Sequence, residues 1–407
     1  MKVLIFTADS NGGYPVPAVK GGAVSTLIEH LVAENNKKLI CDMEIVSFYN
    51  KEAEDKAEKY YSNIHFTWVK VPLILKYFDK CIFRLIRVIK KGEKSISFRS
   101  PFALLYYIHK AKIIANRTDA NKIVIENNIP LARVMQNTKY KGQWYYHFHN
   151  VPRIDAGCRK EFQRVTKFLC VSTYVANQIS SEQSAIGMID SQKTAVLYNC
   201  VDTKLFKSID KSDAIVNNIR EKYGFSDDDF ILIFVGRLSV EKGVDKVLDA
   251  MLKLPKRVKL LIVGSLFSGI NVLTEYQVRI KEKSEKLHDR VYFTGYVKQE
   301  EMPYMYNVAN VAVLPSMWEE PAGLTMVEAM ACGVPVISTL SGGIPEYLGG
   351  VSILIQRDNN IVESIVASVE KLMNDEIYMQ KLVSLGTKRA QLLSNDIYCE
   401  KFVYLIN

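Results

Sequence analysis

The feature that most constrains this chain is the alternation of short apolar runs with longer amphipathic segments over nearly its whole length. Apolar runs of strand length that alternate with helical patterns are typical of a parallel β-sheet with crossover helices. The sequence therefore predicts an α/β protein with doubly wound sheets. The strand-like runs are KVLIFTA, MEIVSFY, HFTWVKV, KIVIEN, WYYHFHN, KFLCVS and TAVLYN in the first half, and FILIFVGR, VKLLIVG, VYFTGYV, VAVLPS, PVIST and VSILIQ in the second.

A polar, charged stretch separates the two series of runs, VDTKLFKSIDKSDAIVNNIREKYGFSDDD. A chain of 407 residues is longer than one typical core requires. We therefore expect two Rossmann-like domains of similar size, 1–205 and 229–392, joined by a linker at 206–228. The apolar residues of the last segment, 393–407, have helical spacing, so this segment is expected to form a closing helix.

The composition is that of an ordinary globular protein, with 48% hydrophobic and 24% charged residues. Its seven cysteines are scattered, include no CxxC pair and lie mostly in apolar runs. This pattern predicts buried, reduced thiols in a cytoplasmic protein, rather than disulfides or a zinc site. The N-terminal MKVLIFTAD is expected to be a first strand rather than a signal peptide, and the sequence has no run of 18 or more apolar residues.

Arg237 and Lys242 lie on one expected strand-to-helix loop, between the run FILIFVG and a helix expected from about Val244. In open α/β sheets, ligands bind beyond the carboxyl ends of the strands. A helix N-terminus adds unpaired N–H groups, so two cations beside it suit a diphosphate. The alternative is a solvated turn whose cations pair with Glu241 or Asp245.

The stretch PSMWEEPAGLTMVEAMACGVPVI places Glu320 in a turn after a strand and Glu328 within an apolar helix expected to begin near Gly323. A buried carboxylate needs a compensating partner. Carboxylates accept strong hydrogen bonds from vicinal hydroxyls, and the backbone N–H groups of Gly323 and Leu324 remain available for ligand oxygens. The alternatives are a dipole-stabilising role for Glu328 and a surface position for Glu320. Glu319 is interpreted as structural.

These motifs carry a family resemblance. The spacing of Glu320 and Glu328, followed by EAMACGVPVI and SGGIPEYL, resembles the retaining GT-B glycosyltransferases of the large glycogen-synthase-like family four. FVGRLSVEKGVD, YNCVD near residue 200 and an N-terminal glycine loop resemble the same family, densely in the second domain and sparsely in the first. The resemblance implies a GT-B fold, in which two Rossmann-like domains face a central cleft, and a nucleotide-sugar donor.

The resemblance also implies roles for individual residues. Glu328 is similar to the acid that holds the ribose hydroxyls, and Glu320 to the acid at the hydroxyls of the donor sugar. Arg237 and Lys242 resemble the pair that neutralises the departing diphosphate. The other implied positions are the amides of Gly323 and Leu324 near the donor sugar, and the turn at Gly295 and Tyr296 near the base.

In the first domain, KGGAVSTLIEHL resembles the glycine loop that approaches the diphosphate, with Gly21, Gly22 and Ala23 at that position. Glycine suits such a loop because backbone without a Cβ can come close to a ligand. The strand WYYHFHN resembles one that ends in a histidine touching the transferred sugar. His147 and His149 share a strand face. We favour His149, which lies nearer the carboxyl end, whereas His147 has the alternative of a core histidine.

No Asp-x-Asp pair follows a strand, so we predict a metal-independent enzyme in which the two cations replace the ion. No cofactor is expected, because the nucleotide sugar is a substrate. Retention and a preference for UDP over GDP or ADP are implied by the family alone. Ala322 and Cys200 depart from the family pattern and leave the sugar open.

The expected function is transfer to a glycan or lipid-linked acceptor in bacterial surface polysaccharide biosynthesis. Two alternatives remain open. One is a catalytically silent GT-B subunit that supports a partner glycosyltransferase, and the other is a GT-B sugar-nucleotide epimerase.

The formal charge of +9 is concentrated between residues 73 and 117, which contain eleven Lys and Arg residues but only two acidic residues, Asp79 and Glu93. The first part of this segment is expected to form a helix rich in Leu, Ile and Phe. A cationic helix of this composition suits peripheral contact with an anionic membrane, which we expect at the inner face of the plasma membrane. The alternative is a solvated face of a helix packed on the sheet. Nucleic acid is not an expected partner, because the cations are interleaved with aliphatic residues. One stripe is predicted for Lys76, Lys80, Arg84, Arg87 and Lys91.

Overall fold

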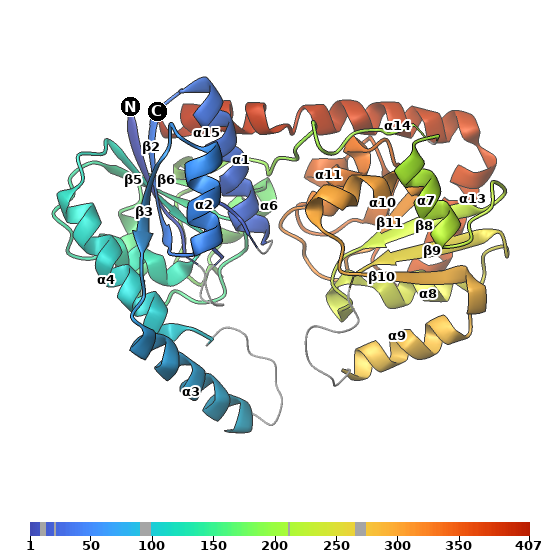
Figure 1. Ribbon diagram of the computed structural model, residues 1–407, viewed down its shortest axis with the longest axis horizontal. Helices are drawn as coiled ribbons and strands as arrows, with labels where there is room; N and C mark the ends of the chain where they lie inside the picture. Colours follow the sequence, from blue (N-terminus) through green and yellow to red (C-terminus); the bar gives the residue numbers. More distant parts are fainter. Residues whose placement is uncertain (9–13, 20–21, 90–98, 211, 265–273) are drawn as a thin grey trace. The chain divides into compact units, whose positions relative to one another are not determined.

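The computed structural model describes residues 1–8, 14–19, 22–89, 99–210, 212–264 and 274–407, without the side chains of residues 87–89. Gly21 of the predicted glycine loop and Lys91 of the predicted cationic stripe lie outside the described residues. The chain forms two compact units, Met1–Tyr198 with Asn395–Asn407 and Asn199–Ser394 (Figure 1).

The division between the units differs from the predicted boundary near residue 205. The expected linker, 206–228, belongs to the second unit, where α7 (Ala214–Lys222) packs against α10 (Met302–Val308). Val216 and Ile219 of α7 are buried, so this charged stretch contains an amphipathic helix. The helix expected at the end of the chain is α15 (Asn395–Ile406), which packs against α1 (Ala23–Lys38) of the first unit.

All seven runs predicted for the first half form strands of one parallel sheet within the described residues. Its order is β3-β2-β1-β4-β5-β6-β7. Central strands such as β1 are buried on both faces, which explains their continuous apolar sequence. The strands are β1 (Lys2–Phe6), β2 (Asp42–Phe48), β3 (His65–Val69), β4 (Lys122–Glu126), β5 (Gln143–Phe148), β6 (Lys167–Cys170) and β7 (Thr194–Val196).

Helices cover this sheet, and Tyr107 anchors one of them, α4 (Pro101–Arg117), at the carboxyl ends of two strands. The Tyr107 hydroxyl donates to the Val46 carbonyl at 2.6 Å and accepts from the Thr7 amide at 3.2 Å. These bonds hold α4 beside the sheet edge at which ligands of such folds bind. The remaining helices of the unit, besides α1 and α15, are α2 (Lys51–Tyr60), α3 (Leu73–Ile89), α4 (Pro101–Arg117), α5 (Arg159–Gln163) and α6 (Thr173–Ile179).

The six runs predicted for the second half also form one parallel sheet in the described part of the second unit, in the order β10-β9-β8-β11-β12-β13. Its strands are β8 (Phe230–Val235), β9 (Val258–Val263), β10 (Val291–Gly295), β11 (Val311–Leu314), β12 (Val336–Thr339) and β13 (Ile353–Ile355). The helices besides α7 and α10 are α8 (Val244–Met251), α9 (Glu275–Glu285), α11 (Leu324–Ala331), α12 (Ile344–Leu348), α13 (Ile361–Asn374) and α14 (Glu376–Gln391).

Each sheet has a point at which the strand order reverses, between β1 and β4 in the first unit and between β8 and β11 in the second. Ligands of doubly wound folds bind at such points, beyond the carboxyl ends of the strands. The loops after these four strands are therefore where functional side chains are expected. The seven cysteines are free thiols, and all except the partly buried Cys81 are buried, as the sequence predicted.

Candidate functional site

The ion pair between Lys242 and Glu320 joins the two loops at the reversal point of the second sheet. The Lys242 Nζ atom lies 2.6 Å from Glu320 Oε2, and both side chains are largely buried. Lys242 ends a short 3-10 turn, Val240–Lys242, after β8, whereas Glu320 lies in the loop after β11. Gly243 permits this approach, because a Cβ there would lie 2.5 Å from the Pro315 carbonyl oxygen. The fold therefore unites two site residues that are far apart in the sequence.

The Glu320 carboxylate has further donors on the same oxygen. Its Oε2 accepts from the Trp318 indole N–H at 2.8 Å and from the Ser316 hydroxyl at 3.3 Å. Its backbone carbonyl accepts from the Gly343 amide at 2.7 Å. Gly342 has a φ of 54°, and a Cβ there would lie 2.2 Å from the Glu320 carbonyl oxygen. The turn SGG thus fixes the orientation of Glu320, while no hydrogen bond to its Oε1 is recorded among the described residues.

Arg237 directly follows Gly236 at the end of β8, and its side chain is exposed. The alternative pairing of Lys242 with Glu241 or Asp245 is wrong, because Lys242 bonds Glu320. The α8 helix begins at Val244, as predicted. Arg237 and Lys242 therefore lie on one strand-to-helix loop of the second unit. The two carboxylates have other partners, Ser239 for Glu241 and both Lys246 and Tyr276 for Asp245.

Glu319 has contacts that differ from those of its neighbour. It forms an ion pair with Arg357, and its Oε2 accepts from the Gly342 amide at 2.6 Å. These contacts tie Glu319 to the loop after β12 and to the segment after β13. Of the two neighbouring carboxylates, Glu319 and Glu320, it is therefore Glu320 that contacts Lys242.

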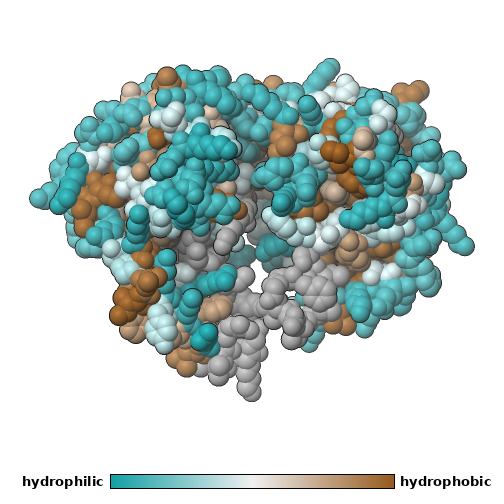
Figure 2. Space-filling model, viewed as in Figure 1, coloured by the Kyte–Doolittle hydropathy of each residue, from teal (hydrophilic) through white to brown (hydrophobic). Residues whose placement is uncertain are grey.

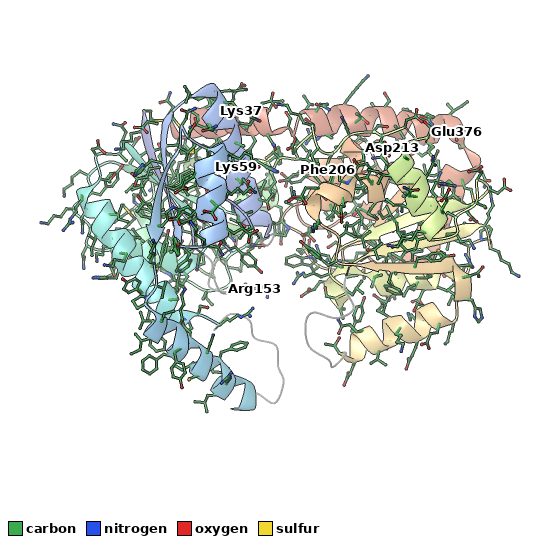
Figure 3. The ribbon with its side chains drawn as sticks, in the orientation of Figure 1. Lys37, Lys59, Arg153, Phe206, Asp213 and Glu376 are labelled. Atoms are coloured by element: carbon green, nitrogen blue, oxygen red, sulfur yellow. The ribbon has the colours of Figure 1, made fainter. Side chains whose placement is uncertain are left out.

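Glu328 has a buried hydroxyl as its compensating partner. It lies in the second turn of α11, and its Oε2 accepts from the Tyr306 hydroxyl at 2.9 Å. Tyr306 is fully buried on α10 and packs against Phe206, which is labelled in Figure 3. Burial raises the pKa of Glu328 to about 7, and the Tyr306 hydrogen bond offsets this shift only in part. One hydroxyl leaves the carboxylate poorly compensated, and this favours additional donors from a ligand.

Other predicted residues of the second unit lie near strand ends. Gly323 precedes α11 as its N-cap, and Leu324 is the first helical residue. Gly295 ends β10 with a φ of 75°, and the following Tyr296 is 76% exposed. Within the described residues, no hydrogen bond or ring contact links Tyr296 to Glu320.

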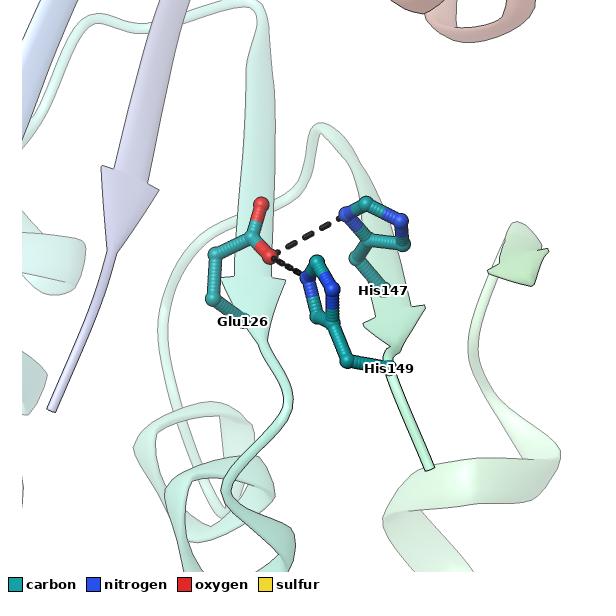
Figure 4. Close-up of side chains that lie close together, drawn as sticks. All are labelled: Glu126, His147 and His149. Atoms are coloured by element: carbon teal, nitrogen blue, oxygen red, sulfur yellow. Dashed lines mark hydrogen bonds and ion pairs between the residues drawn. The ribbon is translucent and has the colours of Figure 1, made fainter. Parts of the chain in front are cut away.

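In the first unit, a single carboxylate contacts both candidate histidines (Figure 4). Glu126 Oε2 lies 2.9 Å from His149 Nε2 and 3.1 Å from His147 Nδ1, and the two rings are 4.1 Å apart. Glu126 ends β4, whereas His147 lies near the end of the neighbouring strand β5 and His149 directly follows its last residue. All three side chains are buried. They therefore share the carboxyl edge of the sheet, and the two histidines share a face as predicted.

The charges in this cluster determine which nitrogen of His149 carries the proton. Burial favours a neutral Glu126, but the charge and hydrogen bonds of the histidines outweigh it and lower its pKa to about 2. Burial and the charge of His147 lower the pKa of His149 to about 4. Since an ionised carboxylate only accepts hydrogen bonds, His149 donates through Nε2–H. Its Nδ1 atom is buried and has no hydrogen-bond partner among the described residues.

Glu126, His147 and His149 are also a donor set that a metal ion can use, with ligand atoms within 4.8 Å of one another. Two imidazoles and a carboxylate match catalytic zinc sites. In this structure the carboxylate instead contacts both rings directly. The sequence prediction of metal independence thus remains to be tested at this cluster.

Neighbouring loops support the cluster. Asn127 Oδ1 accepts from the His149 amide at 2.9 Å, and the Asn128 side chain donates to the Ala8 carbonyl at 3.0 Å. Gly22, with a φ of 115°, precedes α1, and Ala23 is its first residue. These contacts place residues from the loops after β1, β4 and β5 at one edge, where the strand order reverses.

Sequence reasoning missed four of the residues described above, Ser316, Trp318, Tyr306 and Glu126. Glu126 had a usable signal, because it is a polar residue at the carboxyl end of a predicted strand, as His149 is. Trp318 and Ser316 adjoin the carboxylates in sequence, but nothing in the sequence indicates that they donate to Glu320. Tyr306 lies in an apolar helix and gives no signal of its bond to Glu328.

Two doubly wound units, each with polar residues at a reversal point, define the GT-B architecture. Over its whole length the chain superimposes on the UDP-glucose complex of Anabaena HepE, with a TM-score of 0.70, 16% identity and 99% coverage of that chain. Residues 216–389 match the model of the family Glycosyl transferases group 1. The second unit therefore resembles this family, and the resemblance found in the sequence is confirmed for that part of the chain.

Curated relatives match part of the chain. A glycosyltransferase of Methanocaldococcus jannaschii is 29% identical over 227 residues, which are 54% of this chain and 55% of that protein. Lipopolysaccharide 1,2-N-acetylglucosaminetransferase of Salmonella typhimurium is 27% identical over 165 residues, which are 39% of this chain and 43% of that protein. The chain spans about half the length of the curated relatives it matches.

Proposed function

We propose that this protein transfers a sugar from a nucleotide-sugar donor, with UDP as the nucleotide, to a glycan or lipid-linked acceptor. The observation that carries the proposal is the Lys242–Glu320 pair at the reversal point of the second sheet, with Arg237 on the same loop as Lys242. One relative is a lipopolysaccharide 1,2-N-acetylglucosaminetransferase, which supports a role in surface polysaccharide biosynthesis, and a fold neighbour with bound UDP-glucose supports UDP as the nucleotide.

Glu328 and Glu320 bind the hydroxyls of the donor in this proposal. Glu328 has one hydroxyl partner and a raised pKa, so two ribose hydroxyls would supply the hydrogen bonds that its charged form lacks. Glu320 uses Oε2 for its protein donors, and Oε1 accepts from a hydroxyl of the donor sugar. The amides of Gly323 and Leu324 lie at the start of α11 for the remaining sugar oxygens, and the exposed Tyr296 stacks on the base.

Arg237 and Lys242 stabilise the leaving group. The bond between the anomeric carbon and the diphosphate oxygen breaks, and the acceptor oxygen forms a bond to the same carbon on the same face, with retention. The acceptor proton passes to the departing diphosphate. Preorganised cations at this position lower the barrier as negative charge develops, in place of a metal ion. In this proposal the backbone at Gly22 and Ala23 binds the diphosphate, and Gly21 of the same loop lies outside the described residues.

His149 contacts the transferred sugar in the proposal, and its neutral Nδ1 accepts from a sugar hydroxyl. Glu126 holds the imidazole in this tautomer. Glu126 is thus a positioning residue rather than a group that touches the substrate.

The α3 helix supports attachment to an anionic membrane surface. It exposes apolar side chains beside Lys76, Lys80 and Arg84, and Figure 2 shows hydrophobic atoms along it. Helices of this composition lie in the headgroup plane of bilayers. Among the described residues, no helix has the length and apolar character needed to cross a membrane. The exposed fractions are 82% for Leu73, 63% for Ile74, 65% for Tyr77, 49% for Phe78 and 59% for Leu85.

Thermal shift and hydrolysis assays with a panel of nucleotide sugars test the donor assignment. We expect one nucleoside diphosphate sugar series to stabilise the wild type and to lose this effect in Glu328→Ala. If no nucleotide sugar stabilises the wild type, the donor assignment is wrong and a catalytically silent subunit becomes the better description.

A further inference from the structure

A cavity of about 480 Å³ lies in the first unit, and none of the residues assigned to the donor or to the histidine cluster lines it. It opens beyond the carboxyl ends of β2 and β3, and α3 and the start of α4 complete its wall. Its apolar lining includes Phe48, Val69, Val71, Phe83 and Ala103. The cavity is large enough for part of a small-molecule ligand.

The charge of the cavity is strongly positive. Lys76, Lys80, Arg84 and Arg99 line it, and no salt bridge is recorded for them in the described part of the chain. Asp79 is the single acidic residue in this lining, but its two oxygens already accept from the Phe102 and Ala103 amides at 2.8 and 3.0 Å. Asp79 therefore satisfies the N-terminus of α4, and the four cations favour an anionic ligand.

The spacing of α3 joins this cationic cavity to an apolar surface. Lys76, Lys80 and Arg84 recur at intervals of four residues and form one stripe, as the sequence predicted. Leu73 and Tyr77 lie next to that stripe on the helix and are exposed. A ligand with an anionic head and an apolar chain can thus contact both surfaces at once. The side chain of Arg87 and all of Lys91 lie outside the described structure.

The cavity and the histidine cluster share one edge of one sheet. The strand order β3-β2-β1-β4-β5 places β2 two strands from β4, which carries Glu126. With neighbouring strands about 4.8 Å apart, the separation from β2 to β4 is about 10 Å, and β5 with His149 is one strand further. A short saccharide attached to a phosphate in the cavity would span this distance and bring a hydroxyl to His149.

We propose that the cavity lined by Lys76, Lys80, Arg84 and Arg99 binds the phosphate of a phosphorylated lipid that carries the acceptor saccharide. The proposal rests on the proposed function and selects the lipid-linked acceptor from its two acceptor classes. The phosphate lies among the cations, the apolar chain follows the exposed face of α3, and the saccharide extends toward β4 and β5.

Titration calorimetry without any donor tests this proposal with water-soluble probes. We would measure the binding of farnesyl phosphate, farnesol, inorganic phosphate and glucose 6-phosphate to the full chain. We expect farnesyl phosphate to bind about tenfold or more tightly than the other three, because only it offers both a charge-assisted contact and an apolar chain. Lys80→Ala with Arg84→Ala should weaken its binding about tenfold or more.

Matched variants separate a specific site from loss of net charge. Lys59→Ala with Lys110→Ala removes two exposed cations of the same unit outside the cavity and should leave farnesyl phosphate binding unchanged. Arg99→Ala removes a cation from another segment of the cavity wall and should also weaken farnesyl phosphate binding. This single variant keeps the test decisive if the double variant fails to fold.

Three results would overturn the proposal. If farnesol binds as tightly as farnesyl phosphate, the site recognises only the apolar chain. If glucose 6-phosphate or inorganic phosphate binds as tightly as farnesyl phosphate, the site belongs to soluble phosphates. The third result is that farnesyl phosphate does not bind at all. The UDP-sugar thermal shift, measured in parallel, tests the proposed function separately, because none of the residues assigned to the donor lines the cavity. A normal donor shift without farnesyl phosphate binding would reject only the cavity assignment.

Discussion

The Nζ atom of Lys242 lies 2.6 Å from Oε2 of Glu320, across the point where the strand order of the second sheet reverses. The ion pair keeps the carboxylate in place, and within the described ranges of the chain its other oxygen, Oε1, has no hydrogen-bond donor. The Lys242 ammonium and the Glu320 carboxylate are thus preorganised to bind a ligand that has both phosphates and hydroxyls.

Replacement of Lys242 tests the role of this cation. We expect Lys242→Ala to lower kcat about 10²- to 10³-fold, because the departing diphosphate loses a preorganised charge. Transfer from the nucleotide sugar found in the panel would be followed in a steady-state assay. Lys246→Ala is the matched control, since Lys246 lies on α8 and pairs with Asp245. Unchanged turnover in Lys242→Ala would remove Lys242 from the mechanism.

Replacement of Glu328 should change stability and donor binding in opposite directions. Its folded-state pKa of about 7 lies above the ordinary 4.5, so its carboxylate destabilises the fold increasingly as the pH rises from 4.5 to 7. Glu328→Gln should therefore raise the free energy of unfolding at pH 8 by up to about 3 kcal/mol, with little effect at pH 4.5. The same variant should lose stabilisation by UDP, because the ribose hydroxyls lose a charged acceptor.

Urea unfolding at the two pH values measures the first effect and thermal shift the second. Glu300→Gln, which changes an exposed carboxylate of the same unit, should alter neither. If Glu328→Gln is less stable than the wild type at pH 8, the ionised Glu328 carboxylate does not destabilise the fold and this prediction is wrong.

Glu126→Gln tests the positioning of His149. The pKa of Glu126 is lowered to about 2, so its charged form stabilises the fold above about pH 4.5. This contribution is lost as the pH falls from 4.5 toward 2.

We expect the turnover of Glu126→Gln to be lower than that of the wild type by at least about tenfold, because a neutral amide no longer specifies the His149 tautomer. Stabilisation by UDP should persist, since Glu126 contacts the two histidines and is not among the residues assigned to the nucleotide.

The pH profile of kcat separates positioning from a purely structural effect, since the acid limb should move only when the His149 environment changes. Glu34→Gln is the control, as Glu34 is a buried carboxylate of the same unit that pairs with Lys37. A Glu126→Gln enzyme with wild-type turnover and an unchanged profile would reject the role.

Metal removal tests the mechanism at the histidine cluster. We expect transfer to be unaffected by EDTA, because Arg237 and Lys242 supply the positive charge at the diphosphate. Elemental analysis of the purified protein would accompany the assay. Reversible loss of activity, restored by Zn²⁺, would instead assign a metal to Glu126, His147 and His149.

Membrane attachment through α3 predicts cosedimentation with anionic vesicles and weaker binding to neutral ones. Leu73→Ser with Ile74→Ser should reduce binding at least about tenfold, since each buried aliphatic side chain contributes about 1.5–3 kcal/mol. Leu252→Ser, at an exposed leucine of the second unit, serves as the control. Equal cosedimentation of wild type and α3 variant would exclude this surface.

Much of the fold follows from local sequence patterns. Each strand was predictable because a parallel strand covered on both faces must be apolar throughout, as FILIFV of β8 is. The positions of Glu320 in a turn after a strand and of Glu328 in the following helix were also predictable, because the apolar run, the Pro/Gly turn and the helical pattern follow one another in the sequence. The boundary was predicted less well, because polar composition conceals the buried Val216 and Ile219 of α7.

The sequence by itself determined two doubly wound sheets, the loops that carry Arg237, Lys242 and Glu320, and the cationic stripe of α3. Only the tertiary structure decided that Lys242 bonds Glu320, that Tyr306 compensates Glu328 and that Glu126 holds His149. The physical reason is the range of the interactions. Strand and helix patterns record burial within a few residues, whereas each of these bonds joins residues more than twenty positions apart that meet only when the sheets form.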